Sequence, residues 1–445
     1  MLETMKACIK DKRVLILGFG REGKSTYRMI QQVKGYTDLG IADLNPVTEP
    51  LEDNITVITG EDYQKSLNKY DVVFKSPGIV LEQDISGYTC KILSQTELFF
   101  RRFRSQIIGI TGTKGKSTTT TLLYHVLKEA GKKCLLAGNI GIPAFDIAEQ
   151  VEADTIICFE MSSHQLEYMT VSPKTGVLMN IHEEHLDHYG TMEKYVAAKE
   201  NIYRNQKSGD LLICNEDILP REGTCAAQVI SIGYEGSKSD IVVTDQTVCY
   251  HGKTYEIPTK EISLIGVHNY YDIGVVYGLI QKFGIDDQMF TKALKTYEPL
   301  PHRLQYIGMV NNIKYYDDSI STICDTTIQA LTSLKDADTV LIGGMDRGID
   351  YQELILFLNH HSISNIILME ATGKRILSEI KSDYPNFNGL DRIHLVEHLE
   401  DAVALAKKIT KEGKSCVMSP AAASYGIFKN FEERGEVYAK LVHSK

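Results

Sequence analysis

Short apolar runs alternate with amphipathic stretches from the start of the chain. The run "RVLILG" precedes a glycine turn and the helix-compatible stretch "KSTYRMIQQV", and the runs "ITVITG" and "DVVFKSPG" follow. Apolar runs of this length, bounded by turn residues, predict buried strands, and strands that alternate with helices predict a parallel sheet. The pattern therefore predicts a small Rossmann-like parallel domain over residues 1–95.

The same alternation continues over residues 96–300 with the apolar runs "IIGITG", "KCLLAG", "TIICFEMSS", "GVLMNI" and "DLLICN". Its character changes at "IVVTDQTVCYHGKTYEIP", where alternation on both sides of His251 and Gly252 predicts an antiparallel hairpin. Two helical patterns, "HNYYDIGVVYGLIQKFG" and "DDQMFTKALKTY", follow it. These patterns predict a central parallel sheet with a small antiparallel element.

A third α/β segment, residues 301–445, begins at the proline-marked connection "EPLPHR". The stretch "LQYIGMVNNIKYYDDS" predicts a hairpin that turns at Asn311 and Asn312. The strand patterns "DTVLIGG", "NIILME", "IHLVE" and "SCVMSP" then alternate with helical ones. The fold class predicted for the whole chain is therefore α/β with three domains, of which the last is again Rossmann-like.

The composition agrees with a multidomain globular protein and limits its partners. A chain of 445 residues exceeds what one hydrophobic core usually organises. Its 58 acidic and 48 basic residues give a net charge of −10, which argues against general binding to nucleic acid or anionic membranes. Nine scattered cysteines, no signal-peptide pattern and no long apolar run predict a cytoplasmic protein with reduced thiols.

A glycine-rich turn follows the first predicted strand. Gly18, Gly20 and Gly23 form a G-x-G-x-x-G pattern, and Asp43 lies 20 residues after Gly23, at the end of the next predicted strand. Glycines at these positions allow a tight turn and a close approach of backbone N–H groups to a diphosphate. The pattern leaves three interpretations open: a dinucleotide such as NAD or FAD, another nucleotide diphosphate, or close packing alone.

A second glycine-rich turn, "TGTKGKST", connects a predicted strand to a predicted helix. In the usual G-x-x-x-x-G-K-[ST] phosphate loop a glycine would occupy position 110, but this chain has Ile110 there and its nearest glycine is Gly112. The loop is therefore a shortened variant. Its backbone N–H groups can hold phosphates, Lys116 can neutralise phosphate charge, and the hydroxyl of Ser117 or Thr118 can reach Mg²⁺.

Further candidate residues follow other predicted strands. Glu160 ends an apolar strand, which suits either a magnesium ligand or a capping acid. In "NIHEEHLDHYG", His182 and His185 are one residue too close for the zinc motif H-E-x-x-H, so a histidine beside Mg²⁺ or a polar loop is favoured. Lys199 has the pattern of a solvated helical lysine. Arg303, with Asp317 and Asp318, predicts either a nucleotide contact at a domain junction or a structural ion pair.

Taken together, these segments resemble the Mur ligases, the ATP-dependent amide-forming enzymes of peptidoglycan precursor synthesis. The resemblance covers nearly the whole chain through "GFGREG", "SPG", "GTKGKSTTT", "GNIG", "EMSSHQLE", "NIHEEHLDHYG", "AAKENIY", "GVHNYYD", "LPHRLQ", "DDS", "LIGGMDRGIDY" and "SPAAASYGIFKNFEERG". The shortened phosphate loop is typical of these enzymes and of folylpolyglutamate synthases. "LPHR" and the last segment are most similar to the branch that adds D-glutamate to UDP-N-acetylmuramoyl-L-alanine.

The resemblance implies a role for each candidate residue. It implies UDP-substrate binding by Gly18, Phe19, Gly20, Arg21, Gly23, Asp43, Ser76, Pro77, Gly78 and Asn139. It implies ATP binding by Gly112, Thr113, Lys114, Gly115, Lys116, Ser117, Thr118, Asn269, Arg303 and Asp318. It implies catalytic roles for Lys116, Glu160, His185 and Lys199, with two Mg²⁺ ions held by Ser117, Glu160, His185 and a carbamylated Lys199. It implies binding of the incoming amino acid by Thr322, Arg347, Ser419 and Phe428.

The resemblance also implies a mechanism in which ATP converts the substrate carboxylate to an acyl phosphate that the amino acid attacks. The last domain would close over ATP, and the protein would act as a monomer. Two residues depart from the D-glutamate branch: Ile320 replaces a common lysine, and Arg347 stands where a lysine is usual. Alternatives are L-glutamate or another acceptor, a folylpolyglutamate synthase, a nicotinamide oxidoreductase and a nucleotide-switch module.

Overall fold

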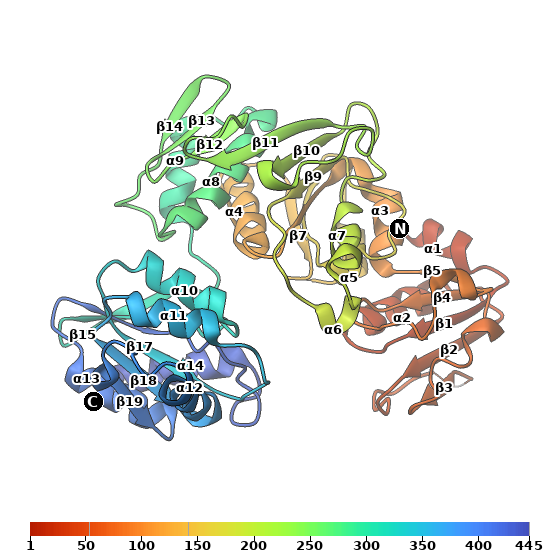
Figure 1. Ribbon diagram of the computed structural model, residues 1–445. Coiled ribbons are helices and arrows are strands. Elements are labelled where there is room, and N and C mark those ends of the chain that lie inside the picture. The colour runs from red at the N-terminus through yellow and green to blue at the C-terminus, as the bar shows by residue number, and fades with distance from the viewer. Residues whose placement is uncertain (53, 141, 445) are drawn as a thin grey trace. The chain divides into compact units, whose positions relative to one another are not determined.

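The computed structural model describes residues 1–52, 54–140 and 142–444 and has an α/β fold (Figure 1). The chain divides into two compact units. Unit 1 comprises Met1–Ile262 and His268–Tyr297, and unit 2 comprises Ser263–Val267 and Glu298–Lys445. Three sheets, in which parallel pairing predominates, confirm that the chain has the predicted α/β class, whereas the division into three domains stays a prediction. No described helix combines the length and the apolar character that crossing a bilayer requires.

The first sheet of unit 1 is entirely parallel, as the sequence predicts, with strand order β3-β2-β1-β4-β5. Buried apolar residues on its central strand β1 explain its formation, because Val14 to Leu17 are all inaccessible to solvent. Its strands are β1 (Arg13–Leu17), β2 (Asp38–Asp43), β3 (Thr56–Thr59), β4 (Val72–Lys75) and β5 (Lys91–Leu93). Its helices are α1 (Leu2–Ile9) and α2 (Arg21–Val33), and α3 (Gln95–Phe103) leads to the next sheet.

The glycine-rich turn after β1 lets α2 start close to the strand. A Cβ atom on Gly23 would lie 2.1 Å from the carbonyl oxygen of Gly18, so no larger residue fits without movement of the backbone. Gly18 itself has a φ of 89°, a left-handed conformation that favours glycine. The G-x-G-x-x-G pattern therefore serves at least to pack the helix against the turn.

The second sheet of unit 1 has nine strands in the order β14-β13-β12-β11-β10-β9-β6-β8-β7. Strands β6 to β11 pair in parallel with all their neighbours. Strand β12 is parallel to β11 but antiparallel to β13, and with β13 and β14 it forms the antiparallel element. The hairpin predicted at His251 and Gly252 is confirmed, and both residues have positive φ. The strands are β6 (Ile107–Thr111), β7 (Cys134–Gly138), β8 (Ile156–Glu160), β9 (Thr175–Leu178), β10 (Leu211–Asn215), β11 (Gln228–Tyr234), β12 (Ile241–Val243), β13 (Thr247–Tyr250) and β14 (Lys253–Glu256).

The helices that follow these strands cover the second sheet and continue the alternation seen in the sequence. They are α4 (Lys116–Glu129), α5 (Ser163–Leu166), α6 (Leu186–Tyr189), α7 (Met192–Glu200), α8 (Val267–Ile280) and α9 (Asp287–Thr296). Helix α8 is apolar on nearly all sides, and the eleven residues from Tyr270 to Ile280 are all buried. A helix buried all round belongs to the interior of a large unit.

One hydrophobic core joins the two sheets of unit 1. Phe99 on α3 lies between them, and its ring centroid is 6.0 Å from that of Phe159 on β8. A polar contact also joins the two parts of unit 1, because Arg28 on α2 forms an ion pair with Asp146, which follows β7, at 2.7 Å. Because the sheets share a core, the division of unit 1 into two domains near residue 95 stays a prediction.

Unit 2 is built on a six-stranded sheet with the order β15-β16-β20-β17-β18-β19. Only β15 is antiparallel to its neighbour, and the predicted turn at Asn311 and Asn312 is confirmed, with φ of 50° and 60°. The strands are β15 (Gln305–Val310), β16 (Ile313–Asp317), β17 (Ala337–Gly343), β18 (Asn365–Met369), β19 (Ile393–Val396) and β20 (Ser415–Met418). Two apolar clusters lie on its faces beneath α10 (Cys324–Ser333), α11 (Gln352–His360), α12 (Glu370–Asp383), α13 (Leu399–Ile409) and α14 (Phe431–His443).

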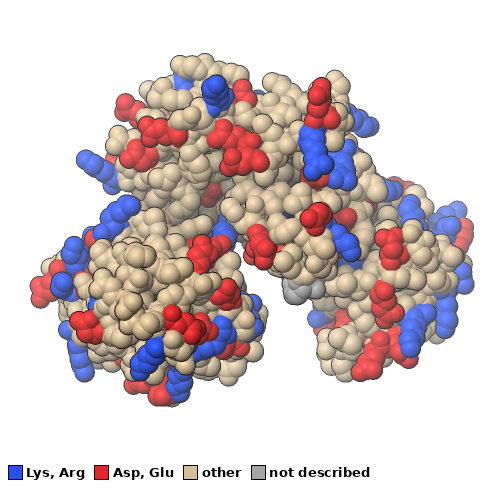
Figure 2. All heavy atoms as spheres, viewed as in Figure 1, with Lys and Arg blue, Asp and Glu red and all other residues tan. Residues whose placement is uncertain are grey.

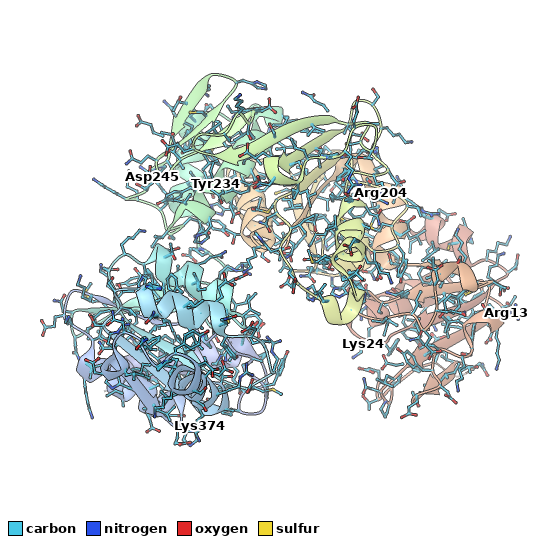
Figure 3. The ribbon with its side chains drawn as sticks, viewed as in Figure 1. Arg13, Lys24, Arg204, Tyr234, Asp245 and Lys374 are labelled. Carbon is cyan, nitrogen blue, oxygen red and sulfur yellow. The ribbon has the colours of Figure 1, made fainter. Side chains whose placement is uncertain are left out.

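Charged side chains of both signs are interspersed on the visible faces of the two units (Figure 2). Exposed ion pairs such as Arg13 with Asp71 and Lys374 with Glu397 lie at the periphery, where the labelled Arg13 and Lys374 side chains are seen (Figure 3). Exposed pairs of this kind add little to stability because water and salt screen them. The fold therefore depends mainly on its apolar cores.

Gly20 and Gly23, two of the three glycines of the first turn, provide a matched test of close packing. A Gly23→Ala change should destabilise unit 1 by about 1–3 kcal/mol because the methyl group meets the Gly18 carbonyl oxygen. Gly20→Ala is the control, since a Cβ atom at Gly20 meets nothing within 4 Å. Urea denaturation followed by circular dichroism measures both variants. Equal midpoints for the two variants would contradict the packing role of Gly23.

Candidate active site

The shortened phosphate loop connects β6 to α4, as the sequence predicts. Gly115 precedes the helix with a φ of 81°, and a Cβ atom there would lie 2.6 Å from Asp272 Oδ1. In an α-helix the backbone N–H groups of the first turn point away from the helix's own carbonyls, and in α4 this turn begins at Lys116. Such a helix start attracts a phosphate through these N–H groups and the helix dipole.

The end of β9 fixes the conformation of this loop. The backbone N–H groups of Thr113 and Lys114 donate to Oδ1 of Asn180 at 3.0 and 2.8 Å, and Asn180 Nδ2 donates to the Lys114 carbonyl at 3.1 Å. Lys116 Nζ donates to the Thr113 carbonyl at 2.7 Å. Asn180 therefore ties the middle of the loop to the neighbouring strand and engages two of the loop's N–H groups.

Lys199 supports the loop from α7 and is almost completely buried. Lys199 is only 1% exposed, and its Nζ donates to the Gly112 carbonyl oxygen at 2.7 Å. The prediction of a solvated lysine from the sequence pattern is therefore wrong. Burial, and secondly the charge of Lys116, lowers the pKa of Lys199 well below its usual value, while Glu184 opposes the shift. The Tyr195 ring lies 4.8 Å from the same nitrogen.

Glu160 lies at the end of β8, as predicted, and is 1% exposed. Its Oε1 accepts a hydrogen bond from Asn139 Nδ2 at 2.8 Å, whereas the buried Oε2 has no partner among the described residues. Leaving a buried carboxylate oxygen unpaired is costly. This oxygen therefore has the capacity to bind a cation.

Three histidines lie close together on two short helices: His164 on α5, which follows Glu160, and His185 and His188 at the start of and on α6. The ring of His164 lies 4.8 Å from that of His185 and 4.3 Å from that of His188. Burial, with the charges of His188 and His185, lowers the pKa of His164 to about 4. His185 has a left-handed φ of 59°, and its Nε2 is 3.6 Å from Glu184. Within the described ranges no group of three or more His, Cys, Asp or Glu side chains is arranged to hold a metal ion.

The residues predicted to hold the UDP substrate converge on the first turn of unit 1. The Phe19 N–H donates to Asp43 Oδ2 at 2.6 Å, and Ser76 Oγ donates to the Gly18 carbonyl at 2.7 Å. Arg21 Nη2 donates to the Asn139 carbonyl at 2.9 Å, which connects this turn to the second sheet. The space around Gly20 and Gly78 is open, because a Cβ atom at either position meets nothing within 4 Å. Pro77 lies between Ser76 and Gly78.

In unit 2, Asp318 is the centre of a buried polar cluster. The hydroxyls of Ser321 and Ser419 each donate to Asp318 Oδ2 at 2.6 Å, and the Leu304 N–H donates to Oδ1 at 3.0 Å. Burial raises the pKa of Asp318 to about 6, although these hydrogen bonds and Arg303 act in the opposite direction. Arg303 keeps a buried Nε without a partner among the described residues.

The residues predicted to bind the amino acid also lie in unit 2. Arg347 Nη2 donates to the Thr322 carbonyl at 3.0 Å, so two of these residues are in direct contact. Arg375 holds the loop that carries Arg347 through an ion pair with Asp346 at 2.6 Å. Phe428 is half-buried against the apolar cluster beneath α13 and α14. Asn269, in contrast, belongs to unit 1.

Sequence reasoning missed two residues that shape the site. The sequence pattern assigns Asn180 no role, although this residue follows the apolar run of β9, at the edge of the sheet where ligands usually bind. Arg434 also received none, yet it is 1% exposed and donates to the Ser319 and Ala422 carbonyls at 2.8 and 3.0 Å. The strand end was a usable signal for Asn180. Nothing in the pattern of α14 marked Arg434 as buried.

Comparison with known proteins places this geometry in a family. The model of the Mur ligase middle domain matches residues 110–279, which include the phosphate loop, Glu160 and Lys199. UDP-N-acetylmuramoylalanine--D-glutamate ligase of Acetivibrio thermocellus is 32% identical over 100% of this chain and 98% of its own length. The enzyme of the same name from Latilactobacillus sakei is 32% identical over 98% of both chains.

Solved structures share the fold over nearly the whole chain. The MurF ligase from Thermotoga maritima in complex with ADP has a TM-score of 0.62 and 16% identity, and the match covers 99% of this chain and 97% of that one. UDP-N-acetylmuramate-alanine ligase MurC from the same organism has a TM-score of 0.59 and 17% identity, with 96% and 98% covered. The full-length relatives and the matched middle domain together show that the chain belongs to the Mur ligase family.

Proposed function

We propose that this protein is an ATP-dependent ligase that joins D-glutamate to the carboxylate of UDP-N-acetylmuramoyl-L-alanine. The observation that carries the proposal is the phosphate loop held between Asn180 and the buried Lys199. Full-length relatives bearing this activity in their name support the choice of substrates. Mur ligases use ATP, and a structural neighbour binds ADP.

The UDP part of the substrate would lie at the turn formed by Gly18 to Gly23. Asp43 and Ser76 hold the turn from two sides, and the open space at Gly20 and Gly78 lets a diphosphate approach the backbone. A nicotinamide enzyme would use this turn but would leave the phosphate loop and Glu160 without a role. We therefore assign the turn to a nucleotide diphosphate other than NAD.

Mg²⁺ fits the site because Glu160 Oε2 is buried and without a partner in the described part of the chain. Carboxylate and hydroxyl oxygens are the ligands that Mg²⁺ prefers. Ser117, Glu160, His185 and a carbamylated Lys199 would hold two ions. Bound there, Mg²⁺ supplies positive charge that offsets the negative charge of the phosphates.

Carbamylation requires an uncharged lysine, and the surroundings of Lys199 favour that form. Burial lowers its pKa well below the usual value, which leaves a lone pair on Nζ for attack on CO₂. A C–N bond forms, one proton leaves the nitrogen, and the product carries one negative charge. The change places an anion beside Lys116, so the two side chains attract each other.

The reaction would proceed in two steps within a site that excludes water. Lys116 and the N–H groups at the start of α4 would stabilise the γ-phosphate as the substrate carboxylate attacks it, giving an acyl phosphate and ADP. The amine of D-glutamate would then attack the acyl carbon, and phosphate would leave from a tetrahedral intermediate. The chain's own contribution is positioning and electrostatic stabilisation.

Unit 2 would supply the amino acid and part of the ATP site. Arg347 offers a guanidinium that can pair with a carboxylate in bidentate fashion, and Thr322, Ser419 and Phe428 would complete the pocket. Arg303 and Asp318, with Asn269 of unit 1, would contact ATP after unit 2 closes over it. The three-domain division, the monomeric state and the cytoplasmic location stay predictions.

Substrate-dependent phosphate release tests the proposed reaction. Purified protein with ATP and Mg²⁺ should release phosphate at a steady rate only when both UDP-N-acetylmuramoyl-L-alanine and D-glutamate are present. L-Glutamate is the control for the identity of the added amino acid. This control is needed because Ile320 stands where the D-glutamate branch commonly has a charged lysine near the amino acid. Phosphate release with L-glutamate but not with D-glutamate would reassign the amino acid that is added. Failure to release phosphate with either amino acid would overturn the proposed reaction.

The role of Lys199 as a carboxylate can be tested by chemical rescue. Lys199→Ala should lower kcat roughly 10²–10³-fold because the charge that holds the metal is lost. Added formate or acetate should restore part of the rate by occupying the vacated space. Lys194→Ala, an exposed lysine on the same helix, should keep normal activity. Failure of every small carboxylate to rescue a folded Lys199→Ala protein would contradict the role.

A further inference from the structure

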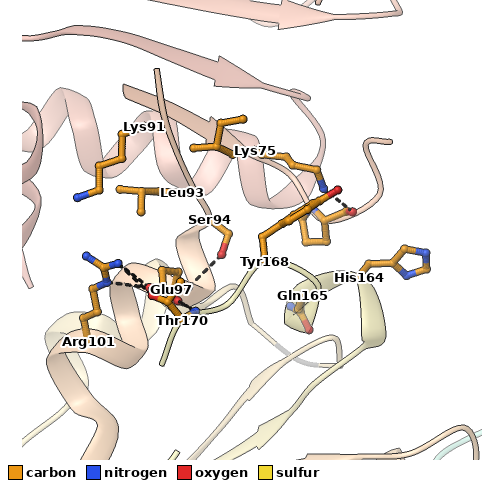
Figure 4. A pocket seen from close by; sticks show the side chains of 12 residues that line it. Lys75, Lys91, Leu93, Ser94, Glu97, Arg101, His164, Gln165, Tyr168 and Thr170 are labelled. Atoms are coloured by element: carbon orange, nitrogen blue, oxygen red, sulfur yellow. Dashed lines mark hydrogen bonds and ion pairs between the residues drawn. The ribbon is translucent and has the colours of Figure 1, made fainter. Parts of the chain in front are cut away.

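A cavity lies in unit 1 beneath the Ser76–Gly78 turn, and Pro77 is the one residue of its described lining that the proposed substrate site also uses. It measures ≈ 200 Å³, far more than the ~30 Å³ that a water molecule occupies in the liquid. Figure 4 shows two of its sides, with Lys91, Leu93 and Arg101 on one and Lys75 and Tyr168 on the other. These residues come from β4, β5, α3 and the segment after α5. The cavity is therefore formed where the two sheets of unit 1 meet.

The charged groups of the lining have an excess of positive charge. Lys75, Lys91 and Arg101 face one carboxylate, that of Glu97. Glu97 is 3% exposed and is already engaged, because its Oε1 accepts from Arg101 Nε at 2.8 Å and from Thr170 Oγ1 at 2.6 Å. Among the residues that the structure describes, Lys75 and Lys91 are thus left without a carboxylate of the lining to pair with.

Lys75 is the more unusual of these two cations because it is buried. It is 5% exposed, and its Nζ donates only to the carbonyls of Ser76 and Pro77, at 3.3 and 3.2 Å, within the residues that the structure describes. Burial lowers the pKa of Lys75 to about 8, although the more distant Glu167 and Glu22 oppose the shift. A buried ammonium group that lacks an adjacent anion gains strongly from one.

The remaining walls define the rest of the ligand. Pro77, Leu93 and the Tyr168 ring provide apolar surface, and the Lys75 nitrogen lies 5.2 Å from the centroid of that ring. Apolar walls with a few fixed polar groups are the usual make-up of a small-molecule site. We propose that this cavity binds a compact organic anion with an apolar body, such as an aromatic carboxylate, whose charged group pairs with Lys75.

Such a ligand would act on the neighbouring turn. Lys75 holds the carbonyls of Ser76 and Pro77, so an anion that pairs with Lys75 changes the hydrogen bonds that support this turn. Ser76 in turn donates to the Gly18 carbonyl at 2.7 Å. The cavity is thus connected by two hydrogen-bonded steps to the glycine-rich turn, and its lining includes Pro77 but neither Gly18 nor Asp43.

Isothermal titration calorimetry of the full chain with benzoate tests the proposal, with benzamide as the neutral probe of similar shape. Benzoate should bind saturably and more tightly than benzamide. Lys75→Met should weaken benzoate binding by roughly 10- to 100-fold, because a charge-assisted hydrogen bond is lost. Lys69→Met, which alters an exposed lysine outside the cavity, should leave binding unchanged.

Lys75→Gln provides a second variant if Lys75→Met does not fold, and it should also weaken binding of benzoate but not of benzamide. Saturating UDP-N-acetylmuramoyl-L-alanine should leave one benzoate site per chain. Absence of saturable binding, equal affinity for the two probes, or full affinity in both folded lysine variants would overturn the proposal. Complete loss of benzoate binding in the presence of the UDP compound would also overturn it, because the cavity would then belong to the substrate site.

Discussion

The buried contact between Lys199 and the phosphate loop is the constraint on which the site depends. Its Nζ donates to the Gly112 carbonyl from one side, while Asn180 binds the next two residues from the other. The spacing from the first glycine, Gly112, to Lys116 is shorter than in the usual phosphate loop, so the loop has fewer residues with which to hold its own shape. Neighbouring elements provide the missing support, which explains why α7 and the end of β9 pack against it.

The electrostatics of the loop follow from the same contact. Two lysines, Lys116 and Lys199, lie close enough for the charge of one to lower the pKa of the other, and burial adds to this effect. An uncharged Lys199 removes the conflict, and its carbamate would turn a repulsive pair into an attractive one. The Oε2 atom of Glu160, which has no partner among the described residues, fits the same scheme, since a cation bound there would compensate its negative charge.

Hydrophobic patterning was sufficient to predict the α/β class, both hairpins and most strands, because strands buried on both faces appear as continuous apolar runs. It missed β5, which has only three residues, and β11, whose run "QVISIGY" mixes polar and apolar positions. The phosphate loop and Glu160 were found from their places at strand ends. The burial of Lys199, the role of Asn180 and the core shared by the two sheets arise from contacts between distant segments, which spacing does not encode.

The most direct test of the account follows the oxygen atoms of the substrate carboxylate. UDP-N-acetylmuramoyl-L-alanine labelled with ¹⁸O in this carboxylate is incubated with the protein, ATP, Mg²⁺ and D-glutamate, and the released phosphate is analysed by mass spectrometry. An acyl phosphate requires one labelled oxygen to move from the carboxylate to each phosphate, so the account predicts phosphate with a single ¹⁸O atom. Turnover that yields unlabelled phosphate would contradict the transfer of the γ-phosphate to the carboxylate.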